Sequence, residues 1–235
     1  MNLAETMEAL EGYGSEQTRK VLTRHGAREP FFGVKIGDMK KLLKRTGKDH
    51  ELSLQLFDTG NSDAMYFASI IADETKLTKK DLRKWVRQAY WYMLSQYAVS
   101  QTAAETKHGW SLGLEWIESK KENIVSAGWS TLSNIVSVEP NEDLDLKEIK
   151  ALMARIEKKI HQGMNREKHA MCGFIICVGC YIPELHEEAL KIGQRIGKVE
   201  IERATPGCSV PEIVADIENV KAKGRLGKKR KRARC

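Results

Sequence analysis

The sequence is poor in proline, in strand-like alternation and in long apolar runs. Its 235 residues include only 5 prolines, and the longest apolar run, residues 174–182, is far shorter than the ~20 residues that a membrane-spanning helix needs. The N-terminus carries early acidic residues and lacks the basic start of a signal peptide. We therefore expect a protein of the cytoplasm with no membrane partner.

Cysteine is also scarce. The 5 cysteines, an odd number without a secretory signal, predict reduced thiols. The spacing of Cys172, Cys177 and Cys180, with Cys208 downstream, would suit an iron–sulfur cluster or zinc. However, the first three lie in an apolar run, and helical spacing turns Cys177 away from the other two. The sequence therefore predicts no metal site and no cofactor.

Positive charge is concentrated at one end. The net charge is +7, and residues 224–235 contain seven lysines and arginines and no acid, which leaves residues 1–223 formally neutral. Such a dense basic block repels itself and commonly binds nucleic acid. We predict a folded domain over 1–223 and a disordered basic tail over 224–235. The tail's candidate nucleic-acid-binding residues are Lys228, Lys229, Arg230, Lys231 and Arg232.

Amphipathic helical patterns fill most of the chain. Residues 145–160 place apolar side chains on one face at helical spacing, and Asp145 with Glu148 opens the segment as a helix cap does. Thr78 with Asp81 starts another helix in the same way. The run at 174–182 could be a buried strand, but the polar spacing before it favours a buried helix. Residues 198–203 are the one short strand candidate. We predict an all-α fold of antiparallel helical pairs stacked as an α-solenoid.

Two stretches carry a family resemblance. The first is the turn Phe31-Phe-Gly-Val with its basic helix, followed by Leu56-Phe-Asp and the alanine-rich helix that begins at Asp63. The second runs from Ser95 through the tryptophan-bearing segments after it. Together they resemble the DNA alkylation repair (AlkD-like) glycosylases, loosely over residues 15–195. The resemblance implies a HEAT-like helical-repeat fold that holds duplex DNA, and excision of N3- and N7-alkylated purines.

The resemblance also points to a catalytic helix. Active members carry an aromatic residue and, four positions later, an aspartate that faces the oxocarbenium-like charge on the sugar. The matching positions here are Tyr97 and Gln101, so an amide replaces the acid. The family's phosphate-gripping arginine matches Ser126, where it is absent. Glu105, one turn beyond Gln101, is the first alternative acid. These departures predict slow or absent base excision.

Further candidates for nucleic-acid contact lie outside that helix. Lys35, Lys40 and Lys41 form a basic helix that could meet phosphates, and Trp110 opens the helix next to the catalytic one. The sequence predicts a monomer that binds duplex DNA and cleaves an N-glycosidic bond if it is active. Two alternatives stay open, namely a non-catalytic binder of distorted or branched DNA and a helical protein-interaction scaffold.

Overall fold

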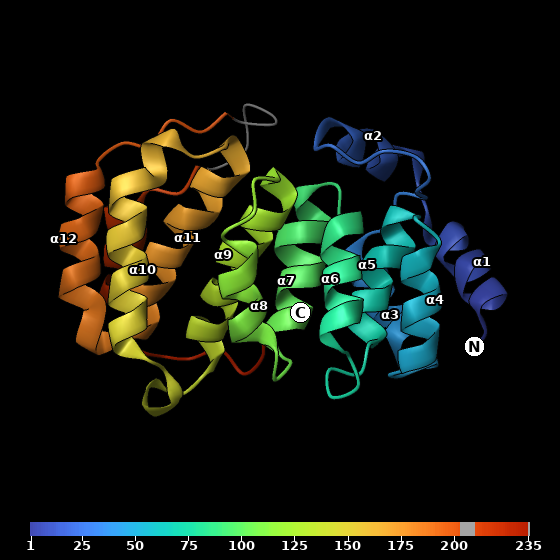
Figure 1. Ribbon diagram of the computed structural model, residues 1–235. Helices are drawn as coiled ribbons and strands as arrows, with labels where there is room; N and C mark the ends of the chain where they lie inside the picture. Colours follow the sequence, from blue (N-terminus) through green and yellow to red (C-terminus); the bar gives the residue numbers. More distant parts are fainter. Residues whose placement is uncertain (203–209, 235) are drawn as a thin grey trace.

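The computed structural model describes residues 1–202 and 210–234. Within these ranges the chain forms thirteen α-helices, one π-helix and three short 3-10 helices, with no strand. The N-terminal helices are α1 Leu3–Tyr13, α2 Glu16–Arg24, α3 Ile36–Thr46, α4 His50–Asp58, α5 Ser62–Ile71, α6 Lys79–Gln88, the π-helix η1 Met93–Val99 and α7 Ser100–Ala104. The C-terminal ones are α8 Gly109–Trp116, α9 Glu122–Val138, α10 Leu146–Lys159, α11 Asn165–Tyr181, α12 His186–Ile196 and α13 Ile213–Ala222. They stand side by side in a curved array that is more than one helix deep, with α2 lying across one edge (Figure 1).

Local signals in the sequence place most of these helices. The Asp145 side chain accepts hydrogen bonds from the first backbone N–H groups of α10, and Thr78 with Asp81 forms a reciprocal capping box on α6. The apolar run at 174–182 lies almost wholly in α11, whose buried residues confirm the buried-helix prediction. Residues 198–202 have no regular structure, so the strand candidate there is wrong as far as the structure describes it. The remaining residue of that segment, Arg203, lies outside the described residues.

Four helical segments form a parallel inner row: α5, the continuous pair η1–α7, α9 and α11. Neighbours in this row pack together, with α9 packed most extensively on α11. The axes of all four segments cross the row, and the chain runs in the same direction through each of them (Figure 1). Their N-terminal ends therefore share one edge of the molecule, which we call the N-terminal edge. Their C-terminal ends share the opposite edge, the C-terminal edge.

Two large apolar clusters support this row. One is built from residues of the helices up to α9, and the other from residues of α9 through α13. They meet at α8 and α9, where the backbones approach closely. A Cβ on Gly128 would lie 2.7 Å from the backbone nitrogen of Ile117, so only glycine fits there. The two clusters are thus joined through a tight helix–helix contact.

The basic tail is bound to the body, and the prediction of a disordered tail is therefore corrected. Residues 225–234, which we call the strap, follow α13 and run back along the C-terminal edge (Figure 1, red). Ala233 is completely buried and Arg234 is only 8% exposed. Two basic residues of the strap, Lys229 and Arg234, donate hydrogen bonds to carbonyl and carboxylate oxygens of distant helices. Cys235 lies outside the described residues.

Within the described residues, no single helix is long and apolar enough to cross a membrane. Helix α11 and the segment Pro183–Ile196 meet that standard only as a pair, across a bend of 114°.

Candidate nucleic-acid interface

A pocket of about 440 Å³ lies at the N-terminal edge, beside the chain that follows α2. Polar and aromatic side chains from five segments of the chain converge on it. Its lining consists of His25, Gly26, Arg28, Tyr90, Trp91, Tyr92, Ser95, Glu122, Asn123, Ser126, Asn165, Arg166 and Glu202. We call it the edge pocket. A concave site that combines arginine, amide and aromatic groups is suited to binding a phosphate backbone and unstacked bases.

Arg166 and Tyr92 form the centre of the edge pocket. The guanidinium carbon of Arg166 lies 4.3 Å from the centroid of the Tyr92 ring, a cation–π contact. The same guanidinium donates through Nε to the Gln96 side-chain oxygen at 2.7 Å. The hydroxyl of Tyr92 lies 3.1 Å from Nδ1 of His25. These contacts hold a planar cation and an aromatic ring in fixed positions.

Three helix N-terminal ends open onto this pocket. Tyr92 immediately precedes η1, Glu122 begins α9, and Asn165 begins α11. The unpaired N–H groups of a helix N-terminus and its partial positive charge favour anions such as phosphate. One of these N–H groups, that of Arg166, already donates to the Glu122 carboxylate at 2.9 Å. The pocket therefore offers positive potential together with two carboxylates, Glu122 and Glu202.

The Tyr97–Gln101 pair straddles two kinds of helix. Tyr97 lies in the π-helix η1 and is 39% exposed, whereas Gln101 lies in α7 and is only 9% exposed. Neither residue belongs to the described lining of the edge pocket. Tyr97 packs edge-on against Tyr92, with ring centroids 6.2 Å apart. Tyr97 therefore extends the aromatic surface of the pocket, while Gln101 presents little surface to a ligand.

Ser126 and Arg166 line the same pocket. Ser126 is buried in α9, and its hydroxyl donates to the Asn123 carbonyl. The packing of α11 on α9 brings the guanidinium of Arg166 to the pocket that Ser126 lines. The sequence has serine at position 126. Nothing in the sequence indicated that a residue of another helix would bring an arginine side chain to the same pocket. Only the contact between α9 and α11 reveals it.

Glu105, the alternative acid, is bound by an arginine, as are two other glutamates near the ends of their helices. Both carboxylate oxygens of Glu105 accept hydrogen bonds from Arg234, one from its backbone N–H and one from its guanidinium. The carboxylate of Glu115 accepts a hydrogen bond from the guanidinium of Arg83, and that of Glu118 accepts one from the guanidinium of Arg155. Each arginine lowers the pKa of its glutamate. Glu105 therefore does not face the edge pocket as a substitute for the family's aspartate.

The remaining candidates are distributed over other surfaces. Lys35, Lys40 and Lys41 are exposed on and beside α3, and Lys41 pairs with Asp38 at 2.7 Å. Trp110 lies at the C-terminal edge, where its indole N–H donates to Glu148 at 2.6 Å and its ring packs near Ala233. In the strap, Lys228, Arg230, Lys231 and Arg232 are exposed and Lys229 is half-buried. The structure thus brings Trp110 together with the strap, but separates both from the edge pocket.

The first resemblance motif has a structural role. The carboxylate of Asp63, 4% exposed at the start of α5, accepts backbone hydrogen bonds from Phe32, Gly33 and Val34 at 2.6, 2.8 and 3.2 Å. Burial raises the pKa of Asp63, and the three N–H groups oppose that rise. Gly33 has φ +81°, and a Cβ there would lie 2.7 Å from the backbone nitrogen of Arg19. The motif therefore fixes the loop that joins α2 to α3.

The cysteines of α11 are buried or half-buried thiols. Burial raises the pKa of Cys172 and Cys177 to about 12 and that of Cys180 to about 11, so the thiolate form is disfavoured. Among residues 1–202 and 210–234, no group of three or more His, Cys, Asp or Glu is placed to hold a metal ion. Cys208 lies outside the described residues.

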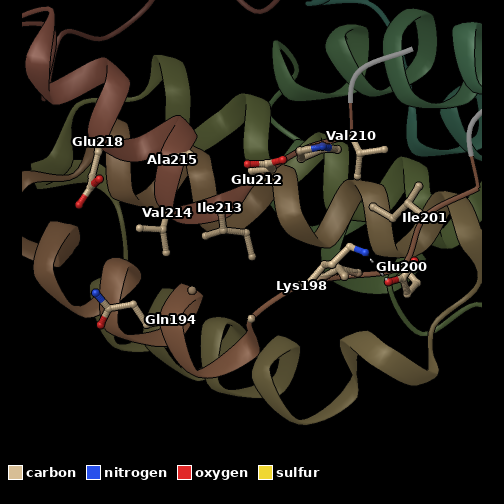
Figure 2. A pocket seen from close by; sticks show the side chains of 14 residues that line it. Gln194, Lys198, Glu200, Ile201, Val210, Glu212, Ile213, Val214, Ala215 and Glu218 are labelled. Carbon is tan, nitrogen blue, oxygen red and sulfur yellow. Dashed lines mark ion pairs between the residues drawn. The ribbon is translucent and has the colours of Figure 1, made fainter. Parts of the chain in front are cut away.

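A second pocket lies elsewhere, between α12 and α13. Its volume is about 650 Å³, and Figure 2 shows Ile213, Val214 and Ile201 on its walls together with Lys198 and Glu200. Lys198 and Glu200 form an ion pair at 3.0 Å. The described lining of this pocket combines apolar with charged side chains, and no arginine or aromatic residue is among the described lining residues.

Comparison with known proteins identifies the family. Residues 6–211 match the DNA alkylation repair enzyme family. The chain is 30% identical to Lin0241, an uncharacterized protein of Listeria innocua, across 94% of this chain and 95% of that protein. It is 29% identical to Lmo0209, an uncharacterized protein of Listeria monocytogenes, across 92% and 94%.

A solved structure superposes with a TM-score of 0.93 at 36% identity and covers 100% of both chains. It is described as "a new family of proteins related to the HEAT-like repeat DNA glycosylases with affinity for branched DNA structures". This likeness confirms the predicted HEAT-like helical-repeat fold. The chain belongs to the DNA alkylation repair enzyme family.

Proposed function

We propose that this protein binds DNA at the edge pocket, prefers branched or otherwise distorted DNA, and acts as a binder more than as a glycosylase. The observation that carries the proposal is the Arg166–Tyr92 stack in a pocket bordered by three helix N-terminal ends. The branched-DNA affinity described for the 36% identical neighbour supports the choice of ligand.

The chemistry of the pocket fits such a ligand. A guanidinium and helix N-termini bind phosphates without reading sequence, which suits recognition of DNA shape. Exposed aromatic faces such as that of Tyr97 can stack on bases whose own stacking is interrupted at a branch point. Distorted DNA offers such bases at lower energy than an intact duplex does.

Base excision is the second candidate activity. It is disfavoured because Gln101 carries a neutral amide, and because the carboxylate of Glu105 is already paired with the guanidinium of Arg234. The carboxylate best placed to act on a bound sugar is Glu122, which lines the edge pocket beside Arg166. If the protein releases alkylated purines, we expect Glu122 to stabilise the oxocarbenium charge.

The test compares DNA binding by arginine variants. Fluorescence polarisation would measure affinity for a labelled four-way junction and for a linear duplex of the same arm sequence. We expect the wild type to bind the junction more tightly. Arg166→Ala should weaken binding about tenfold, because both the cation and its planar contact are lost. Arg166→Lys keeps the positive charge but lacks the planar guanidinium, so its junction affinity should lie between those of the wild type and Arg166→Ala.

Arg155→Ala provides the matched control. Like Arg166, Arg155 lies over an aromatic ring, that of Trp129 at 5.8 Å. Its guanidinium pairs with Glu118, and it belongs to α10 outside the described lining of the pocket. We expect its DNA binding to match that of the wild type. Equal junction affinities for Arg166→Ala and Arg155→Ala would show that the edge pocket is not the interface.

A further inference from the structure

The strap carries two classes of cation. Lys229 and Arg234 point into the body, where Arg234 is 8% exposed. The other basic side chains of the described strap are exposed, and we call them the ridge: Arg225, Lys228, Arg230, Lys231 and Arg232. The first class fastens the strap, and the second is exposed to solvent. Arg230 belongs to both, because its exposed guanidinium also donates to the Asn134 side chain and to the Ala233 carbonyl.

The fastening groups are the C-terminal ends of the inner row. Along the strap, Gly227 donates its N–H to the Cys180 carbonyl of α11 at 2.8 Å. Lys229 donates to the Val136 carbonyl of α9 at 2.8 Å, and the Arg230 N–H donates to Ser137 at 2.8 Å. These carbonyls belong to last helical turns, which have no partner inside their own helix.

Arg234 extends this pattern to α5 and α7. Its guanidinium donates to the carbonyls of Ser69 and Ala72 at 3.0 and 2.8 Å, at the end of α5. It also contacts two carboxylates, Glu105 at 2.6 Å and Glu74 at 2.5 Å. A single side chain therefore binds the ends of two inner helices.

This arrangement places positive charge against the negative ends of the inner helices. Parallel helices align their dipoles, so each C-terminal end contributes a partial charge of about −0.5 at this edge. Without the strap, the carbonyl ends and Glu105 would repel a phosphate backbone. The inward cations neutralise these groups, and the ridge then adds positive side chains on the outside.

We infer that the ridge is a second DNA-binding surface, which takes the phosphate backbone of a further duplex arm when the edge pocket holds a branch point. This inference rests on the proposed function. The edge pocket and the ridge lie at opposite ends of the same helices, and the 17 residues of α9 separate them by about 25 Å. A linear duplex seated at the pocket leaves the ridge unused, whereas a junction sends another arm towards it.

The bound strap also makes the ridge more effective than a disordered arm of equal charge. Its backbone is already fixed by the hydrogen bonds to α9 and α11, so less conformational entropy is lost when DNA binds. Residues 212–234, which include the ridge, lie beyond the family match at 6–211. The ridge therefore adds to whatever the shared family fold contributes.

The main test neutralises the ridge without loosening the strap. Lys228→Gln, Lys231→Gln and Arg232→Gln are combined in the full chain, because these three exposed residues leave the anchors Lys229, Arg230 and Arg234 in place. The control variant combines Lys150→Gln, Lys158→Gln and Lys191→Gln, which are exposed on α10 and α12. Junction and linear-duplex binding are measured from 50 to 200 mM salt.

We expect the ridge variant to bind the junction about tenfold more weakly than the control variant, with the salt dependence reduced by about 2 to 3 released counterions. Linear-duplex affinity should change much less. Equal junction affinities and equal salt slopes for the ridge and control variants would overturn the inference. Arg166→Ala in the same assay reports separately on the edge pocket, so failure of one surface is distinguishable from failure of the other.

Two further measurements cover other outcomes. Retention on heparin, a polyanion without branches, should require less salt for elution of the ridge variant than of the control variant; equal elution would show that the ridge does not attract polyanions. Arg234→Ala keeps every ridge charge but removes its anchor. Because the fixed backbone of the strap positions the ridge, this variant should lose its preference for the junction over the linear duplex. The salt concentration at which it elutes from heparin should stay near that of the wild type. Unchanged junction preference would overturn the role of the bound strap.

Discussion

Arg166 lies over the ring of Tyr92, so that a residue near the start of α11 and the residue that precedes η1 form one element of the edge pocket. Neither residue stands at the positions where the family resemblance predicts the catalytic pair. Tyr97 joins this element through its contact with Tyr92, whereas Gln101 is buried below it. The recognition surface that we propose is therefore centred on a contact between helices and not on one helix face.

The exposure of Tyr97 gives a first prediction. Tyr97→Ala should weaken DNA binding several-fold, because it removes an aromatic face on which a base can stack. Since the ring is 39% exposed, the free energy of unfolding should fall by less than about 1 kcal/mol. Polarisation titrations and urea unfolding of the same preparation check both parts. Loss of stability without loss of affinity would assign Tyr97 to packing.

The amide at position 101 gives a second prediction. Wild-type release of 7-methylguanine from duplex DNA should be slow or undetectable. Gln101→Asp should raise it only slightly, because the side chain is 9% exposed and the carboxylate must reach the sugar. Single-turnover base release is the measurement. Robust wild-type release that survives Gln101→Ala would move the chemistry to another group, and Glu122→Gln would then be the next variant.

Asp63 gives a prediction about stability. Asp63→Ala leaves the N–H groups of Phe32, Gly33 and Val34 without their acceptor, and at least two of them are buried. We expect the free energy of unfolding to fall by about 3 kcal/mol or more. Asp58→Ala is the control, since Asp58 forms an exposed ion pair with Lys84 that contributes about 0–1 kcal/mol. Similar urea midpoints for the two variants would contradict this role of Asp63.

His169 predicts a dependence of stability on pH. Burial, with a smaller contribution from Arg166, lowers the pKa of His169 from 6.5 to about 4. Between these values the unfolded chain binds a proton that the native protein does not. The stability that neutral His169 contributes is therefore present above pH 6.5 and is lost as the pH falls towards about 4. Thermal unfolding from pH 7 to 4.5 should show a steeper decline for the wild type than for His169→Asn. Parallel curves would argue against a buried neutral imidazole.

The anchor of the strap gives a fifth prediction. Arg234→Ala removes the shared partner of Glu105, Glu74 and two helix-end carbonyls. We expect the free energy of unfolding to fall by about 3 kcal/mol, because removing one member of a buried ion pair leaves the charge of the other without a partner. Arg232→Ala, an exposed change in the same strap, should stay within about 0.5 kcal/mol of the wild type. Equal urea midpoints would show that Arg234 does not anchor the strap.

Periodicity and capping residues were enough to predict an all-α fold and the starts of individual helices at Asp145 and Thr78, because these signals act within a few residues. The position of the tail could not be predicted in this way. Its seven positive charges suggested self-repulsion, while the oxygens that bind Arg234 come from residues at least 129 positions earlier in the chain.

The candidate site shows the same limit. The aromatic residues around Tyr92 were visible in the sequence, but Arg166 reaches the pocket lined by Ser126 only through the packing of α11 on α9. The π-helix at Met93–Val99 gave no recognisable signal, and it changes how i, i+4 spacing maps onto the helix surface. Spacing alone therefore could not establish which side chains share the site.

The strap has a consequence for how the molecule comes apart. In a stack of helical repeats each unit contacts only its neighbours, so the ends fray and unfolding spreads stepwise. The strap joins the chain after α13 directly to α5 and α7, which closes the linear stack into a loop of contacts. Fraying at the C-terminal end must break contacts in the N-terminal half as well. Native-state hydrogen exchange should therefore show α5, α7 and α13 opening as one cooperative unit, although a free-ended solenoid would release α13 alone.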